Sequence, residues 1–154
     1  MHILIDSREK IPLNFSFWSD VDTSTICLKF GDYSLLGLQG RVFVERKASS
    51  GELYGNLVKN YKRFKKELER AKDCHYKYII CEFLQEDILN FPKNSGIPIF
   101  LQKKLRFKGN FFNNRILKIE ENYDIKFIFC GSAEKASEMV IEIFKTIENN
   151  EKIR

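Results

Sequence analysis

Residues 31–47, with the sequence GDYSLLGLQGRVFVERK, decide the fold because they predict two strands joined by a short loop. Apolar residues dominate the runs 33–36 and 41–45, and glycines bracket the loop between these runs. In such a hairpin, the start of one strand lies beside the end of its neighbour. We therefore expect Asp32, which precedes the first strand, to lie close to Glu45, which ends the second.

The rest of the chain predicts an α/β domain around this hairpin. A helix with an apolar stripe, expected over residues 53–71, separates the 41–45 strand from a buried strand at 76–82. A strand, a helix and a strand form a right-handed crossover, which makes the two strands parallel. Further strands are expected at residues 2–5, 25–30 and 125–129, and further helices at 83–89, at 111–123 and after Ser132. We predict a single domain over residues 1–154, with a central mixed sheet of about six strands flanked by helices.

Composition excludes several classes of protein. Hydrophobic residues make up 44% of the chain and charged residues 31%, which suits a folded domain with a solvated surface and not a disordered chain. No apolar run is long enough to span a membrane, and no signal peptide precedes the first strand. The four cysteines form no C-x-x-C pair and are expected to be reduced. We therefore expect no membrane partner and a cytoplasmic or nucleoid/nuclear location, without secretion.

Positive charge is concentrated in one segment of the sequence. The net charge is only +5, but residues 88–119 contain no Asp or Glu. Cations without balancing carboxylates favour contact with a phosphate backbone, while a loop that is simply solvated is an equally good interpretation. The candidate DNA-binding residues of this segment are Lys103, Lys104, Arg106, Lys108 and Arg115.

Carboxylates at the strand ends predict a metal site. Asp6, Glu9, Asp32 and Glu45 would all be ionised at pH 7 from their reference pKa values. Carboxylates gathered at one end of a sheet repel one another unless a cation lies among them, and oxygen ligands select Mg²⁺ or Mn²⁺. Lys47 lies two residues beyond Glu45, on the same side of an extended strand. There it is suited to stabilising charge on a phosphate under attack and to orienting the attacking water.

Three short motifs together resemble the nuclease-domain signature of the XPF-family structure-specific endonucleases. They are IDSRE at residues 5–9, GDY at 31–33 and VERK at 44–47, like the D-x-R-E, G-D-Y and E-R-K series of that family. The resemblance continues into RFKKELER at 63–70, like the family's R-F-x-x-E-L-x-R helix, and into YII at 78–80. Each short motif alone is common by chance, so the conjunction carries the resemblance. It implies a restriction-endonuclease-like fold.

The resemblance also implies roles for individual residues. The candidate catalytic residues are Asp6, Arg8, Glu9, Asp32, Glu45, Arg46 and Lys47. Asp32 and Glu45 are implied to be ligands of Mg²⁺ or Mn²⁺, and Lys47 is implied to be the catalytic lysine. The side chain of Arg46 is expected to face the opposite way, although its backbone carbonyl could also ligate the metal.

Members of that family act on branched or flapped duplex DNA, usually as dimers, in DNA repair and recombination. The resemblance therefore implies branched DNA as a partner and a homodimer formed through the C-terminal helices. The apolar stripe of the last expected helix has a second interpretation, which we favour, as ordinary core packed on the sheet. Two features depart from the family. Gly51 stands where the family usually has an Asp, with Glu52 next to it. We also expect no helix-hairpin-helix domain, although many members of the family carry a C-terminal pair of such motifs.

Three functions fit these observations. The first is a metal-dependent endonuclease that hydrolyses phosphodiester bonds in a flap, fork or junction. The second is a non-catalytic DNA-binding or scaffolding subunit of a nuclease complex, which the Gly51 departure weakly favours. The third is a sequence-specific restriction endonuclease, which ranks last because no insertion large enough to read bases is evident.

Overall fold

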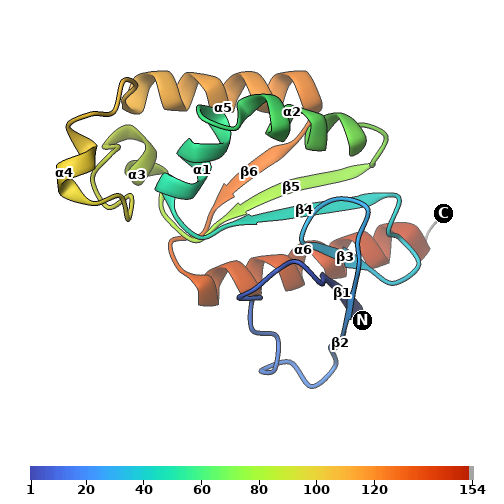
Figure 1. Cartoon of the computed structure of the whole chain (residues 1–154). Helices are drawn as coiled ribbons and strands as arrows, with labels where there is room; N and C mark the ends of the chain where they lie inside the picture. Colours follow the sequence, from blue (N-terminus) through green and yellow to red (C-terminus); the bar gives the residue numbers. More distant parts are fainter. Residues whose placement is uncertain (153–154) are drawn as a thin grey trace.

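The computed structural model describes residues 1–152 and contains one six-stranded mixed sheet with helices on both faces (Figure 1). The strands are β1 (His2–Asp6), β2 (Asp22–Ile26), β3 (Tyr33–Leu35), β4 (Val42–Lys47), β5 (Tyr76–Cys81) and β6 (Lys126–Phe129). They lie in the order β2-β1-β3-β4-β5-β6. β3 is antiparallel to both of its neighbours, and the other neighbouring pairs are parallel. The predicted α/β fold and its mixed sheet are therefore confirmed.

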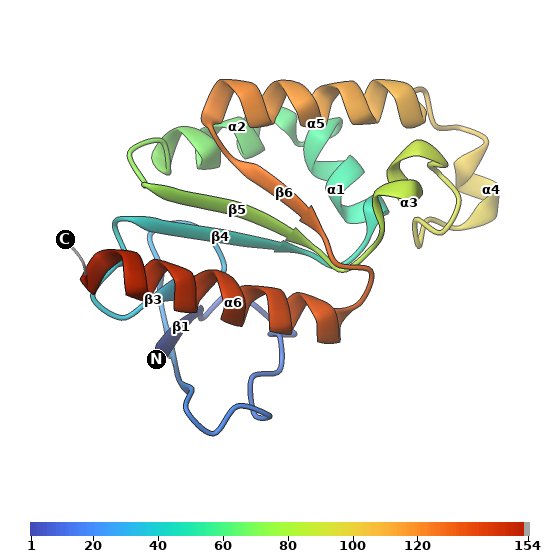
Figure 2. The ribbon, with the colours of Figure 1, turned by 180° about the vertical axis from the view of Figure 1, so that it is seen from behind.

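Helices form a layer on each face of this sheet. They are α1 (Ser50–Leu57), α2 (Tyr61–Arg70), α3 (Gln85–Leu89), α4 (Ile99–Gln102), α5 (Gly109–Tyr123) and α6 (Ala133–Lys152). The two opposite views show α1, α2 and α5 over one face, with α3 and α4 at the end of that layer, while α6 crosses the other face (Figures 1 and 2). None of the helices in the described part of the chain is long and apolar enough to cross a membrane.

Two hydrophobic cores join the sheet to these layers. Successive residues of a strand point to opposite faces, so β4 and β5 supply both cores. Phe43 and Ile79 pack under α1, α2 and α5, whereas Val44 and Ile80 pack under α6. All four side chains are at most 1% exposed. Burial on both faces gives the centre of the sheet its rigidity, and the ends of these strands carry the candidate site.

The last helix packs as part of the core. Its stripe includes Val140, Phe144 and Ile147, each at most 1% exposed against the sheet. The interpretation of this stripe as core is therefore confirmed. A homodimer through the C-terminal helices would have to use the polar side of α6, and it stays a prediction.

The helix expected over residues 53–71 is interrupted. The chain leaves helical geometry at residues 58–60, between α1 and α2. Gly55 and Asn56, in the last turn of α1, are weak helix formers, which explains why one apolar stripe is divided between two helices. The break lets α1 start at the end of β4 while α2 lies over the sheet (Figure 1).

The strand expected at residues 25–30 lies earlier, at Asp22–Ile26. Beyond it the apolar run is buried without being a strand, with Leu28 4% and Phe30 8% exposed. The Leu28 N–H donates to Asp6 Oδ2 at 2.8 Å, a bond that takes this stretch out of the strand ladder. Burial alone could not distinguish a strand from such a loop.

Gly51 lies where α1 meets the loop after α3. Its N–H donates to the carbonyl of Ser95 at 3.1 Å, and a Cβ at this position would lie 2.3 Å from that oxygen. A side chain there would have to displace the Ser95 loop, so packing disfavours the aspartate usual in the XPF family. Ser49 caps α1 by accepting from the Glu52 N–H at 3.1 Å, and the Glu52 carboxylate accepts from the Ala48 N–H at 2.8 Å.

We predict opposite effects from two alanine substitutions in α1. Gly51→Ala forces the Ser95 loop away and should lower the free energy of unfolding by about 1–3 kcal/mol. Gly55→Ala is the matched control, because a Cβ there has nothing within 4 Å and a helical Gly→Ala change stabilises by about 0.5–1 kcal/mol. Urea unfolding measures both. Equal stability of the two variants would contradict the packing described at Gly51.

Candidate active site

Asp32 is held at the start of β3 by backbone contacts with β4. Gly31 has φ +73°, and a Cβ there would lie 2.9 Å from the Val44 carbonyl, so glycine is required at this turn. The Asp32 N–H donates to that same carbonyl at 2.8 Å. In return, the Arg46 N–H donates to Asp32 Oδ2 at 2.8 Å. These bonds fix the carboxylate beside the end of β4, where the hairpin predicts it.

Glu45 and Lys47 form a buried ion pair on β4. Lys47 Nζ lies 2.8 Å from Glu45 Oε1, and Lys47 is only 4% exposed. The ammonium also lies 5.6 Å from the centre of the Phe64 ring and 3.9 Å from a Glu52 oxygen. Both side chains point to the same side of the strand, as their spacing predicts.

Burial makes the carboxyl groups of Asp32 and Glu45 hard to ionise. It raises the pKa of Asp32 to about 8, and the nearby charge of Glu45 adds to the effect. Burial also raises the pKa of Glu45, although Lys47 opposes the shift. A divalent cation between them would remove this penalty. Asp32 Oδ1 and Glu45 Oε2 have no hydrogen-bond partner among the described residues, so both keep acceptor capacity for such an ion.

Asp6 lies in the same region but does not join the pair. Arg8 donates to both of its oxygens, at 2.8 and 2.9 Å, and the N–H groups of Arg8 and Leu28 add two further bonds. Burial raises the pKa of Asp6, but these hydrogen bonds outweigh it and the net pKa is lowered. Asp6 is 2% exposed and ties the end of β1 to the loop that follows β2.

Glu9 is also neutralised by an arginine. Arg46 Nη1 lies 3.4 Å from Glu9 Oε1, and its Nε donates to Glu82. The Arg46 side chain thus faces away from Glu45, as expected. Within residues 1–152, no group of three or more His, Cys, Asp or Glu side chains is arranged to hold a metal ion. The four carboxylates expected to gather do line one pocket, but arginines pair with Asp6 and Glu9. Asp32 and Glu45 form no ion pair with an arginine among the described residues, and the metal-binding role of the group stays a prediction.

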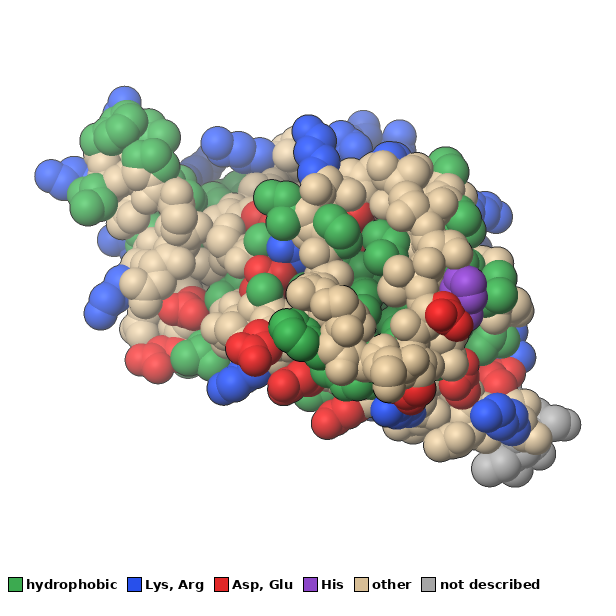
Figure 3. All heavy atoms as spheres, turned by 90° about the horizontal axis from the view of Figure 1, so that it is seen from below, with side chains coloured by type: hydrophobic (Ala, Val, Ile, Leu, Met, Phe, Trp, Pro, Cys, Tyr) green, Lys and Arg blue, Asp and Glu red, His purple; other side chains and the backbone are tan. Residues whose placement is uncertain are grey.

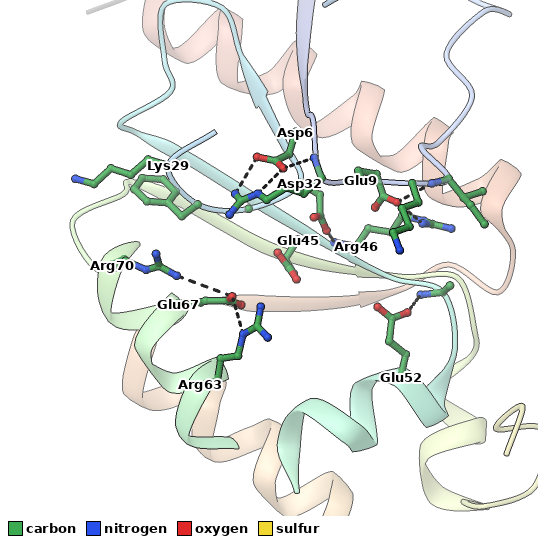
Figure 4. A pocket seen from close by; sticks show the side chains of 16 residues that line it. Asp6, Glu9, Lys29, Asp32, Glu45, Arg46, Glu52, Arg63, Glu67 and Arg70 are labelled. Atoms are coloured by element: carbon green, nitrogen blue, oxygen red, sulfur yellow. Dashed lines mark hydrogen bonds and ion pairs between the residues drawn. The ribbon is translucent and has the colours of Figure 1, made fainter. Parts of the chain in front are cut away.

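A pocket of about 450 Å³ opens over this pair, with cationic side chains around it (Figure 4). The cations that line it are Arg8, Lys10, Lys29, Arg46, Arg63 and Arg70. From α2, Glu67 lies between Arg63 and Arg70, at 4.0 and 3.9 Å, and faces the carboxylate pair. A pocket with carboxylates inside and cations around it can hold a metal ion and the phosphates of a polyanion together.

None of the α2 cations is among the site residues predicted from the sequence. Arg63, Glu67 and Arg70 are spaced at i, i+4 and i+7, which places them on one side of a helix. The R-F-x-x-E-L-x-R resemblance contained this signal. Lys10 and Lys29 follow no motif, and only the loops between β1 and β3 bring them to the pocket.

The five candidate DNA-binding residues fall into two groups. Lys103, Lys104, Arg106 and Lys108 are exposed beyond α4, at the end of the molecule where Figure 3 shows basic side chains around a hydrophobic tip. None of the four lines the carboxylate pocket. Arg115 is different, because its Nη1 donates to the Leu57 carbonyl at 2.7 Å and its guanidinium lies over the rings of two aromatic residues, Tyr61 and Phe111. Through these contacts the Arg115 guanidinium links α5 to the turn between α1 and α2.

The ERCC4 domain family matches residues 5–143, so the chain belongs to this family. This membership supports a nuclease-type role in DNA processing. The predicted relationship to XPF-family nuclease domains is thereby confirmed.

Solved structures agree on the fold. XPF from Aeropyrum pernix is 18% identical with a TM-score of 0.65, and the match covers 94% of this chain and 65% of that one. XPF from Aeropyrum pernix in complex with DNA is 17% identical with a TM-score of 0.68, covering 97% and 66%. The chain thus spans a little less than two thirds of each. No curated protein matches it.

The shifted pKa of Asp32 predicts how stability depends on pH without metal. A carboxyl whose pKa rises on folding stabilises the fold below its ordinary pKa of about 3.9, and this contribution is lost as the pH rises through about 8. The free energy of unfolding in a chelating buffer should therefore fall between pH 5 and pH 9 by more than about 1.4 kcal/mol, the equivalent of one pKa unit. Asp32→Asn keeps the acceptor for Arg46 and should flatten this fall. An equally steep fall in that variant would refute the assignment.

Proposed function

We propose that the chain is a metal-dependent endonuclease that hydrolyses phosphodiester bonds of branched or structured DNA, such as a flap, fork or junction. The observation that carries the proposal is the Asp32–Glu45 pair, which lies half-buried beside the buried Lys47 and is ringed by cations. Family membership supports the same chemistry, and one structure with this fold is described as a complex with DNA. The proposal includes action alongside DNA in the cytoplasm or nucleus, in repair or recombination.

Asp32 and Glu45 would hold Mg²⁺ or Mn²⁺, and the Arg46 carbonyl is the third ligand that the sequence suggests. When bound, the ion polarises a phosphoryl oxygen and lowers the pKa of a coordinated water. Lys47 does not act as a base, because the charges of Glu45, Glu52 and Asp32 outweigh its burial and raise its pKa. As a permanent cation held 2.8 Å from Glu45, it stabilises the negative charge that develops on the phosphate and orients the water.

The cations around the pocket would bind the phosphates that flank the scissile bond. Lys29 lies on one side of the carboxylate pair, with Arg63 and Arg70 across from it on α2 (Figure 4). Arg8 and Lys10 line the same pocket. These charges oppose the carboxylates inside, so a DNA backbone is attracted to the pocket and the ion to its floor.

The alternative is a DNA-binding or scaffolding subunit without catalysis. Gly51 favours it, since the family's usual aspartate would clash with the Ser95 carbonyl there. Against it, Glu52 keeps a carboxylate 3.9 Å from Lys47, and the Asp32–Glu45–Lys47 arrangement is complete. Catalysis therefore remains the better-supported function.

Two conservative substitutions test catalysis directly. Asp32→Asn and Glu45→Gln each remove a ligand charge without changing the size of the side chain. Each should reduce cleavage of labelled flap, fork and four-way-junction DNA in Mg²⁺ by at least about 100-fold, in the range reported for single electrostatic groups at active sites. Binding of the same DNA should be largely unchanged.

Glu138→Gln is the matched control, because Glu138 is an exposed carboxylate on α6 outside the pocket. Full activity of Asp32→Asn and Glu45→Gln, with or without Mg²⁺, would refute the assignment. DNA binding with no cleavage by the unmodified chain in Mg²⁺ or Mn²⁺ would favour the scaffolding alternative.

The basic loop beyond α4 is proposed to hold a duplex arm. If Lys103, Lys104, Arg106 and Lys108 each contact one phosphate, their joint replacement by Ala should make the slope of log K against log salt shallower by about 3.6, at about 0.9 per contact. Titrations of labelled duplex at several salt concentrations measure this slope.

A second quadruple variant controls for net charge in this experiment. Lys72, Lys126, Lys135 and Lys152 are exposed lysines outside the loop, and their replacement by Ala removes the same charge. An unchanged slope in the loop variant, or an equal change in both variants, would show that the loop is only solvated.

A further inference from the structure

A second pocket, of about 410 Å³, lies next to the carboxylate pocket. It is formed between the loop joining β1 to β2 and the start of α6. Ile11 and Arg46 line both pockets, so the two are neighbours separated by little more than these side chains. Any group in the second pocket therefore lies close to a phosphate held in the first.

The wall of the second pocket is apolar and aromatic. Pro12, Leu13, Phe17 and Trp18 line it together with Ile11. Phe17 is 78% exposed and Ile11 72%, although both are large hydrophobic residues. The Phe17 ring stands edge-on to Trp18, with centres 6.4 Å apart and planes at 80°. One face of an aromatic ring in this position is open to a flat partner.

The charges around this pocket are already neutralised or acidic. Arg46 is paired with Glu82 and Glu9, and Glu134 lies in the first turn of α6. A phosphate would meet no free cation here among the described residues, in contrast to the first pocket. Figure 3, which looks onto the side where this loop lies, likewise shows hydrophobic and acidic side chains next to one another. The lining thus suits an uncharged, planar, apolar group.

We infer that this second pocket binds one unpaired nucleobase beside the scissile phosphate, stacked on Phe17. The inference rests on the proposed function, because the first pocket supplies the phosphate-binding half of the nucleotide. The chemistry of a nucleotide matches the pair of pockets: its anionic part fits the cationic rim and its flat base fits the aromatic wall. A protein segment with an apolar side chain would use the second pocket alone.

This arrangement would make the enzyme sensitive to DNA structure. A base can reach Phe17 only after leaving its stack, which costs a few kcal/mol in a paired duplex and least in a single strand or at a branch. The pocket therefore disfavours linear duplex DNA as a substrate. This selectivity needs no inserted segment that reads the base sequence. Flaps, forks and junctions offer an unpaired base next to a duplex arm.

The experiment uses Trp18, the single tryptophan of the chain, as the reporter of binding. A short single-stranded oligothymidylate is titrated in a chelating buffer, so that binding is measured without cleavage. We expect quenching of Trp18 fluorescence by oligothymidylate and much weaker quenching by an abasic oligonucleotide with the same backbone. Phe17→Ala should weaken oligothymidylate binding by about five- to 150-fold, the range for loss of one base–aromatic stack.

Three variants make the result specific. Phe17→Tyr keeps the ring and should bind as the unmodified chain does, whereas Phe17→Leu keeps apolar bulk without a ring and should bind as Phe17→Ala does. Phe100→Ala is the matched control, since Phe100 is an aromatic residue 71% exposed that lines neither pocket. Far-UV circular dichroism verifies that each variant is folded.

Equal affinity of Phe17→Ala and the unmodified chain, or equal quenching by the abasic oligonucleotide, would overturn the inference and leave the pocket to a protein segment. Cleavage of flap DNA in Mg²⁺ is measured separately. If the unmodified chain cleaves flap DNA but shows no base-dependent binding, only the inference about the second pocket is rejected. If it binds the base but does not cleave, only the proposed catalysis is rejected.

Discussion

The hydrogen bond from the Arg46 N–H to Asp32 Oδ2 is the constraint on which the site depends. It links the start of β3 to the end of β4 and holds one carboxylate beside another that the protein also buries. Neither carboxylate is stable there as an isolated anion, which is why burial raises both pKa values. The fold tolerates this cost because two hydrophobic cores fix β4 from either face. A cation bound between the two carboxylates, as proposed, would relieve their mutual repulsion.

Arginines determine which carboxylates remain available to that cation. Arg8 occupies both oxygens of Asp6, and Arg46 is shared between Glu9 and Glu82. The four acidic groups are thus sorted into two that hold loops in place and two that face the pocket. Arg46 has a further consequence, since its pairing leaves the neighbouring aromatic pocket without free positive charge. The ion pairs of Arg46 with Glu9 and Glu82 would therefore direct a phosphate to the first pocket and a base to the second.

The sheet, the hairpin and the Asp32–Glu45–Lys47 arrangement follow from sequence because they depend on strand periodicity and on neighbours in the hairpin. The partners of Asp6 could not be predicted so simply, since the choice between a metal and Arg8 depends on how the loop after β2 folds back onto β1. Arg115 illustrates the same limit. Its spacing fits a basic surface, but Tyr61 arrives from another helix and makes it a packing residue. The break between α1 and α2 likewise decides that Arg63 and Arg70 face the pocket.

The central claim is that Asp32 and Glu45 form a divalent-metal site, and anomalous scattering from crystals soaked in Mn²⁺ tests it most directly. The account predicts an anomalous peak between the two carboxylates, at about 2.0–2.3 Å from an oxygen of each, which disappears in Asp32→Asn crystals soaked identically. A map without a peak at this position at saturating Mn²⁺, or an undiminished peak in the variant, would contradict it.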